Sequence, residues 1–151
     1  MDSKATVQAL MDAVQKGDFV KAQSTLSNDF QFSGPVPQPI SGPAWMGMSA
    51  SLKTAFPDLN YQFKTESVDG NTVHITAQLK GTHKGTLDLS AMGLGVIPPT
   101  NKTFAAALEH GESSVQDGKV KTWVMKSTEG AGLMAILGQL GVKLPSKEVY
   151  G

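Results

Sequence analysis

The chain contains no cysteine among its 151 residues. This absence excludes a disulfide framework, metal sites built from thiolates and catalysis by a thiol nucleophile. Charge of either sign is also sparse and balanced, with thirteen basic and thirteen acidic residues that form no run. A surface that follows a phosphate backbone is therefore not expected, and nucleic acid is a poor candidate partner.

Long apolar segments are missing as well. No apolar run reaches the roughly 20 residues that a membrane helix needs. The first twenty residues carry charge among apolar positions, at Asp2, Lys4, Asp12 and Lys16. The apolar core of a secretory leader lacks such charges. We therefore expect a soluble chain with no membrane partner, and cytoplasmic as the default location.

Motifs for common chemistries are lacking too. The sequence has no Gly-rich phosphate loop, no pair of metal ligands at helical spacing and no nucleophile elbow. We expect neither a metal nor an organic cofactor. The length and the 40% hydrophobic content fit one core, so a single domain is predicted over residues 1–151, with its core at 7–141 and a tail at 142–151.

Three helices are predicted in the first part of the chain. The first has one apolar stripe at i, i+3, i+4 and i+7, with Asp2 or Ser3 as its cap and Gly17 at its end; the stripe is Val7, Leu10, Met11 and Val14. The second begins after Asp18, places Phe19, Ala22 and Leu26 on one face, and ends before Asn28-Asp29. The third has Ser41 as its cap and Pro43 in its first turn, and Pro57 ends it.

From Tyr61 onward the apolar period changes to two, which predicts strands. Tyr61 and Phe63 begin the first, and Asp69-Gly70 predicts a hairpin turn. An alternating segment over 73–80 predicts a long strand with one buried face. Further strands are predicted at 84–89, 103–115 and 120–127, and a last helix at about 130–140 that ends at Gly141. Helices followed by hairpin-joined strands predict an α+β fold, with the helices on one face of an antiparallel sheet.

Five short segments in a fixed order carry a resemblance to a known family. They are Phe56-Pro57-Asp58-Leu59, Gly81-Thr82-His83-Lys84-Gly85, Pro98-Pro99-Thr100-Asn101-Lys102, Asp117-Gly118-Lys119-Val120 and Gln139-Leu140-Gly141. In this order the chain resembles the SnoaL-like polyketide cyclase (ester cyclase) branch of the nuclear transport factor two-like superfamily, over residues 7–141. The resemblance implies a cone-shaped, strongly bent antiparallel sheet packed against N-terminal helices and closed by a C-terminal helix. It also implies a mostly apolar internal pocket, and a homodimer that pairs through the open sheet face of the strands at 103–115 and 120–127.

The acid–base residue of the family has no counterpart here. In the cyclases that the chain resembles, a tryptophan after the Asp-Gly-Lys turn is followed closely by aspartates, and one of these serves an intramolecular aldol ring closure. Here Trp123 follows the turn, but residues 124–128 contain no carboxylate. A positioned base is worth about 10²- to 10⁴-fold in rate. The first hypothesis is therefore a protein that binds a small apolar molecule in the pocket without this aspartate.

The candidate ligand-binding residues for this hypothesis are aromatic or apolar. They are Trp45, Met48, Met92, Leu94 and Trp123. In a cone-shaped fold both tryptophans can line one cavity, although an ordinary core role is open for each of them. The segment 90–100 combines apolar residues with glycines and ends in Pro98-Pro99. It is predicted to be a mobile lid hinged at the prolines, with a static packed loop as the alternative.

The second hypothesis is a cyclase or isomerase that acts on a small apolar or polyketide-like carbonyl compound. General acid–base catalysis would then fall to His83, His110 or Glu112. His83 projects inward if its strand has no bulge, and a ring that is only bonded to the backbone at a turn is the other interpretation. The direction of His110 stays open because Gly111 can mark a bulge. Glu109 and Glu112 are both expected on a solvated face of their strand.

Overall fold

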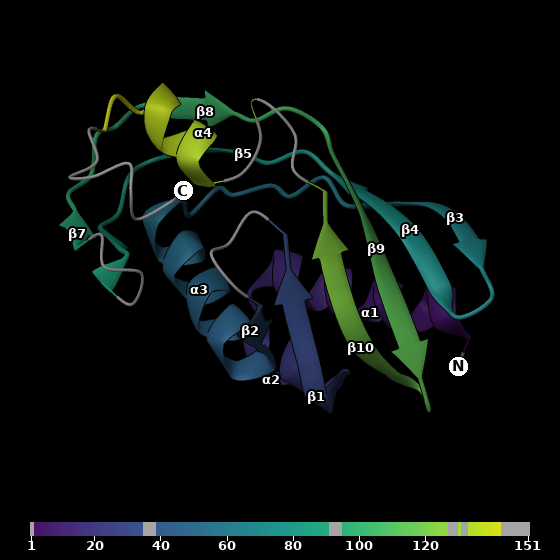
Figure 1. Cartoon of the computed structure of the whole chain (residues 1–151). Coiled ribbons are helices and arrows are strands. Elements are labelled where there is room, and N and C mark those ends of the chain that lie inside the picture. The colour runs from purple at the N-terminus through teal and green to yellow at the C-terminus, as the bar shows by residue number, and fades with distance from the viewer. Residues whose placement is uncertain (1, 35–38, 91–94, 127–129, 131–132, 143–151) are drawn as a thin grey trace.

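The helices and the main sheet form two layers (Figure 1). The computed structural model describes residues 2–34, 39–90, 95–126, 130 and 133–142. The helices are α1 (Ser3–Lys16), α2 (Phe19–Ser24), α3 (Gly42–Ala55) and α4 (Leu133–Gln139). The strands are β1 (Leu26–Ser33), β2 (Ile40–Ser41), β3 (Lys64–Asp69), β4 (Thr72–Ala77), β5 (Lys80–Thr82), β6 (Leu87–Asp88), β7 (Val96–Ile97), β8 (Thr103–Ala105), β9 (Glu109–Gln116) and β10 (Lys119–Met125).

The three N-terminal helices begin and end largely where the sequence predicts. The Asp2 side chain accepts a hydrogen bond from the Ala5 N–H at 2.7 Å, and Gly17 ends α1 in the left-handed region with φ 81°. All four predicted stripe residues of α1 are buried. In α3, Ser41 caps the first turn and accepts from the Ala44 N–H at 3.3 Å. These helices therefore follow from local capping signals and apolar spacing.

One predicted boundary is wrong. The helix α2 ends at Ser24, and β1 already begins at Leu26, so Leu26 lies on a strand. Asn28 and Asp29 lie within β1 at exposed positions, where the register against β10 shifts between Leu26 and Gln31. A bulge accommodates extra residues within a strand, so these polar residues do not end the element.

The main sheet is curved and mostly antiparallel, which confirms the α+β class. Its strand order is β2-β1-β10-β9-β4-β3, with one parallel pair, β1 and β10. The sequence did not predict this parallel pair, because its strands are far apart in the chain. Both hairpins occur where they are expected: Gly70 and Asn71 join β3 to β4. Asp117 and Gly118, with φ 53° and 74°, join β9 to β10, as in a type I′ turn.

The long strands predicted at 73–80 and 103–115 are each broken into two. The Gln78 N–H donates to the Tyr61 carbonyl at 2.8 Å, and the Ala106 N–H donates to the Leu79 carbonyl at 2.8 Å. At these points the backbone leaves the main sheet, and β5 pairs with β8 in a separate two-stranded sheet. The strand predicted at 84–89 is likewise reduced to β6, which pairs with β7.

The C-terminal helix packs on this second sheet (Figure 1). Ile136, Leu137 and Leu140 are buried, as predicted; residues 131–132 and the side chain of Leu133 lie outside the described part. The Gln139 side chain exchanges two hydrogen bonds of 2.9 Å with the backbone of Ala105, so it covers the free edge of β8 as a neighbouring strand would. Within the described ranges, no helix is long and apolar enough to cross a membrane.

Gly85 allows the segment after β5 to approach the end of α3, and this contact is testable. Its N–H donates to the Ala55 carbonyl at 3.0 Å, and a Cβ at this position would lie 2.1 Å from the Thr54 carbonyl oxygen. We expect Gly85→Ala to lower the free energy of unfolding by about 1–3 kcal/mol, because the two backbones must separate. Urea unfolding measures this effect.

The matched control is Gly47→Ala on the exposed side of α3. An added Cβ there meets nothing within 4 Å, and alanine favours a helix over glycine by about 1 kcal/mol. We expect this variant to be as stable as the wild type or more stable. A Gly85→Ala variant that unfolds like the wild type would contradict the close packing.

Candidate functional site

Aromatic rings form a continuous row beneath α3. Trp45 of α3 stacks on Phe30 and Phe32 of β1, with ring centroids 5.3 and 5.1 Å apart, and it contacts Trp123 of β10 at 5.4 Å. Phe63 meets Trp123 edge-on at 5.7 Å, and Tyr61 stacks on Phe63 at 4.8 Å. We call these residues the aromatic row: Phe30, Phe32, Trp45, Trp123, Phe63 and Tyr61.

Strand register and one unusual backbone conformation bring these rings together. Phe32 lies beside Trp123 in the parallel pair of β1 and β10. Tyr61 and Phe63 flank Gln62, whose φ of 51° lies in the left-handed region, and their rings stack with an angle of 10° between planes. The two tryptophans singled out from the sequence thus contact each other. The other four members of the row were not identified as site residues.

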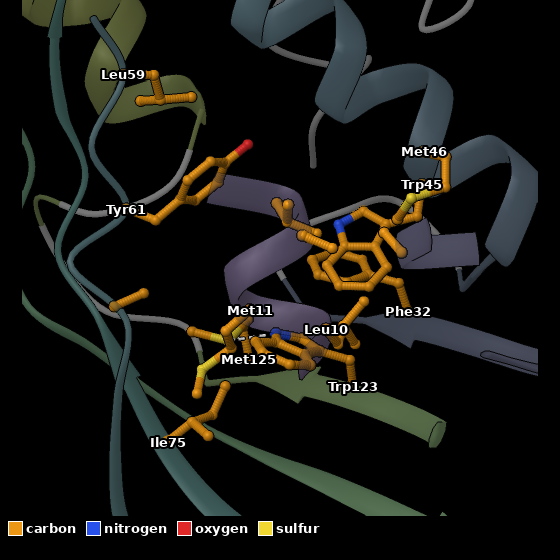
Figure 2. Close-up of a cluster of buried hydrophobic side chains, with 14 of the residues drawn as sticks. Leu10, Met11, Phe32, Trp45, Met46, Leu59, Tyr61, Ile75, Trp123 and Met125 are labelled. Carbon is orange, nitrogen blue, oxygen red and sulfur yellow. Dashed lines mark hydrogen bonds between the residues drawn. The ribbon is translucent and has the colours of Figure 1, made fainter. Parts of the chain in front are cut away.

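The row has few polar atoms, and they are not equivalent. Trp123 donates its indole N–H to the Met125 sulfur at 3.1 Å, whereas the described residues offer the Trp45 indole nitrogen no such partner. Burial raises the pKa of the Tyr61 hydroxyl, and the nearby Ser49 hydroxyl offsets this only in part, without reaching hydrogen-bond geometry. Figure 2 shows the Tyr61 hydroxyl directed toward α3. Tyr61 therefore stays protonated at neutral pH.

The remaining predicted ligand-binding residues are placed only in part. Met48 is partly buried and packs against the core, while Met92 and Leu94 lie outside the described residues. Of the predicted lid, Val96 and Ile97 form β7 and pair with β6. Ile97 is buried and Val96 is exposed, so the second half of this segment is a hairpin arm that packs one side chain.

His83 projects inward and is fully buried, as its strand parity predicts. Its Nδ1 accepts a hydrogen bond from the Thr100 N–H at 3.3 Å and lies 3.0 Å from the Thr100 hydroxyl. In the neutral ring the proton is therefore on Nε2, which is buried and has no hydrogen-bond partner among the described residues. Burial lowers the pKa of His83, and the nearby Gly85 backbone offsets part of this shift without reaching hydrogen-bond geometry.

His83 does not belong to the aromatic row. Its ring packs at 5.3 Å on Phe56, which in turn meets Phe104 at 4.8 Å. Its backbone is paired with the segment before β8, since the His83 N–H donates to the Lys102 carbonyl at 2.9 Å. The structure therefore has a histidine-containing cluster near the end of α3, formed by residues other than those of the row.

His110 and Glu112 lie on the face of the sheet that α1 does not cover. His110 Nδ1 is 3.5 Å from the Glu66 carboxylate, and Glu112 is 3.5 Å from His74 Nδ1. Gly111 is not a bulge, because β9 and β4 pair residue by residue. A Cβ at Gly111 would lie 2.5 Å from the Met125 sulfur, so glycine makes room for Met125.

The same alternation turns Glu109 inward. Glu109 is 8% exposed, and it shares the buried parity of Gly111, Ser113 and Val115. The expectation of a solvated Glu109 is therefore wrong. The sequence analysis does not identify Glu109 as an inward carboxylate, because a bulge at Gly111 would reverse the alternation of side chains. Counting alternate residues back from the apolar Val115 gives the correct face.

Two grooves on the described part of the chain lie away from the aromatic row. One of about 700 Å³ lies between α2, β1 and the β9–β10 turn, and one of about 530 Å³ lies between β5, β8 and Gln139. Both are lined mainly by polar residues. Among all residues that the structure describes, no three His, Asp or Glu side chains are placed to hold a metal ion.

Comparisons with known proteins identify a family and a fold. A family model described as SnoaL-like polyketide cyclase matches residues 4–127. IdmH from Streptomyces antibioticus, a proposed polyketide cyclase, superposes with a TM-score of 0.71 at 21% identity, covering 94% of this chain and 100% of IdmH. AclR from Streptomyces galilaeus, a proposed hydroxylase, gives 0.68 at 23% identity, with 95% and 83% covered. No curated protein sequence matches the chain.

The buried Tyr61 hydroxyl makes stability depend on alkaline pH. Because burial raises its pKa, the unfolded chain releases this proton near pH 10 while the folded chain retains it. The stability that the protonated hydroxyl supports is present below pH 10 and is lost as the pH rises. Tyr61→Phe has no such proton. We expect the difference in unfolding free energy between wild type and variant to shift by about 1.4 kcal/mol in favour of the variant from pH 9 to 11.

Urea unfolding of both proteins at a series of pH values measures this shift. Lysine titration affects both proteins equally and cancels in the difference. Two curves that run parallel from pH 9 to 11 would mean that Tyr61 ionises as readily in the folded protein as in the unfolded chain.

Proposed function

Because the chain belongs to the SnoaL-like polyketide cyclase family, we propose that it binds a small, mostly apolar molecule in the interior beneath α3. The observation that carries this proposal is the aromatic row, in which Trp45 and Trp123 lie 5.4 Å apart. Aromatic walls with few polar groups are typical of small-molecule sites. Flat rings also favour a planar, conjugated ligand, which can take the place of one more ring in the row.

The sheet side of this site is poorly suited to proton transfer. After Trp123, the next inward residue of β10 is Met125, whose sulfur accepts the Trp123 N–H at 3.1 Å, and Val124 is exposed on the other face. A thioether neither donates nor takes up a proton at neutral pH. Binding without the ring closure of the related cyclases is therefore the function that we favour.

The alternative function is a cyclase or isomerase that uses the other cluster. His83 supports it, because a fully buried imidazole whose Nε2–H has no partner among the described residues is a costly group to keep without a role. Glu109 supports it as a carboxylate that faces the interior. His110 and Glu112 support it less, because their side chains form pairs on the outer face. IdmH and AclR, a proposed cyclase and a proposed hydroxylase, suggest that this fold accommodates such chemistry.

We also propose that two copies of the chain pair through the outer face of β9 and β10. Val124 is 40% exposed on this face, and carboxylates pair with imidazoles near it, with Glu112 beside His74 and Glu66 beside His110. A face that carries hydrogen-bond donors and acceptors next to an exposed apolar side chain can complement a second copy of itself under two-fold symmetry.

The ligand site is tested by truncating Trp45. We expect Trp45→Leu to weaken binding of 2-isopropenylnaphthalene, a planar apolar probe, by about 10-fold or more, since a buried aromatic anchor contributes a large share of binding energy. Isothermal titration calorimetry measures the affinity. The control is Phe104→Leu, which truncates a buried ring outside the row and should leave the affinity unchanged. Equal losses in both variants would argue against a site at the row.

The alternative is tested by hydrogen exchange next to a carbonyl. If the protein moves protons, it should incorporate deuterium from D₂O into the methyl group of 2-acetylnaphthalene. Glu109→Gln should then slow this exchange by about 100-fold or more. Glu112→Gln, on the outer face of the same strand, is the matched control and should not. Mass spectrometry measures the exchange, and a wild type no faster than buffer would remove the enzymatic alternative.

Pairing of two copies is tested by sedimentation velocity at micromolar concentration. We expect a dimer for the wild type and a shift toward monomer for Val124→Lys, which places a like charge from each copy at the centre of the contact. A wild type that is only monomeric would rule out the pairing.

A further inference from the structure

We propose that Tyr61 orients the ligand of the aromatic row by donating a hydrogen bond from its hydroxyl to an oxygen of that ligand. The ligand class is then a neutral, planar molecule with a carbonyl or ether oxygen at one end. This inference rests on the proposed binding function and adds a specific contact to it.

The surroundings of Tyr61 leave its proton available. The side chain is buried, and its hydroxyl points toward α3 (Figure 2), where Ser49 is a polar neighbour that does not reach hydrogen-bond geometry. A phenol has one O–H to donate. In the described part of the chain no acceptor lies in hydrogen-bond geometry to that O–H, and a buried donor without a partner is unfavourable. A ligand oxygen would satisfy it.

The Tyr61 hydroxyl is held in place from two sides. Its ring stacks on Phe63. Its backbone is held by Gln15 of α1, whose side-chain oxygen accepts from the Tyr61 N–H at 2.8 Å while its amide nitrogen donates to the Leu59 carbonyl at 2.9 Å. On the other side, the Tyr61 carbonyl accepts from the Gln78 N–H at 2.8 Å. Gln15 is therefore a positioning residue for Tyr61, and a fixed donor is what directional recognition needs.

The chemistry of the row decides what Tyr61 would bind. Among the described residues, the polar atoms of the row that form no hydrogen bond are the Tyr61 O–H and the Trp45 indole N–H. In Figure 2 the Trp45 nitrogen lies on the ring edge nearer to Tyr61. Both atoms are donors, so the ligand must supply an acceptor. The sequence contains no arginine, and none of the described lysines is buried. An anionic acceptor would find no countercharge, so a neutral oxygen is favoured.

The test compares two probes of nearly the same shape, 2-acetylnaphthalene and 2-isopropenylnaphthalene, in which a carbonyl oxygen replaces a methylene group. We expect Tyr61→Phe to lower the affinity for the ketone by about 3- to 10-fold, the effect of one hydrogen bond. The affinity for the alkene should stay within about twofold, because the phenylalanine ring can still stack on Phe63. Calorimetric titration gives the ratio of the two affinities for each protein.

Gln15→Leu and Gln8→Leu separate positioning from general damage to α1. Gln15 holds Tyr61, whereas Gln8 is exposed on the same helix and bonds only to Asp12 at 2.9 Å. Gln15→Leu should reduce the ketone-to-alkene ratio, and Gln8→Leu should not. A merely structural role for Gln15 would lower both affinities equally and leave the ratio unchanged, which would refute its role as a positioning residue.

The outcomes distinguish this inference from the proposed function. If the wild type binds both probes and Tyr61→Phe keeps the wild-type ratio, Tyr61 does not orient the ligand and the inference is overturned, while the binding function stands. If the wild type binds neither probe, the binding function itself is wrong and the inference fails with it. If the wild type prefers the ketone and Tyr61→Phe loses this preference while it still binds the alkene, the result supports both the binding function and the role of Tyr61.

Discussion

The contact between Trp45 and Trp123 joins the helical layer to the sheet, and the arrangement of the interior depends on it. Trp45 lies in the first turns of α3, just after the Ser41 cap, and Trp123 lies on β10 beside Phe32. The parallel pairing of β1 with β10 thus presents Phe32 and Trp123 side by side, and Trp45 packs on both. Removing this contact would leave a cavity between α3 and β10 and interrupt the row.

This arrangement divides the polar groups of the interior between two regions. Near the row, the Trp123 indole N–H is already used, because it donates a hydrogen bond to the Met125 sulfur. The available donors come from α3 and from Tyr61. The groups suited to acid–base chemistry, His83 and Glu109, come from other segments, and His83 packs with Phe56. Ligand orientation and proton transfer would therefore be carried by different parts of the fold.

Local signals in the sequence predict much of this fold, and tertiary hydrogen bonds account for most of the errors. Helix caps, prolines and the Asp117-Gly118 turn determine where helices end and where a hairpin forms. Each of these signals involves residues only a few positions apart in the sequence. The breaks in the long strands depend instead on distant acceptors, the Tyr61 and Leu79 carbonyls. The alternation of apolar residues does not reveal where a strand exchanges one partner for another.

The candidate site shows the same division. Parity correctly turns His83 inward, and it would also have selected Glu109 over Glu112, because β9 pairs with β4 without a bulge. The sequence predicts a strand at Tyr61. A Tyr-Gln-Phe segment contains no residue that favours the left-handed conformation observed at Gln62. Gln15 of α1 holds Tyr61 by a hydrogen bond to its backbone N–H, although the two residues lie far apart in the sequence. A glutamine side chain that pairs with a distant backbone leaves no pattern in a single sequence.

The lack of a buried cation among the described residues also limits how the fold could catalyse a reaction. Removing a proton beside a carbonyl creates negative charge on the carbonyl oxygen, which a cation or preorganised donors must stabilise. With no arginine in the chain and no buried lysine among the described residues, only neutral donors are available for this task. If Glu109 moves a proton, the oxygen that develops charge needs a neutral donor, and the Tyr61 hydroxyl can be one because burial raises its pKa. The group that orients a bound ketone would then also stabilise its enolate, so binding and catalysis would select for the same ligand oxygen.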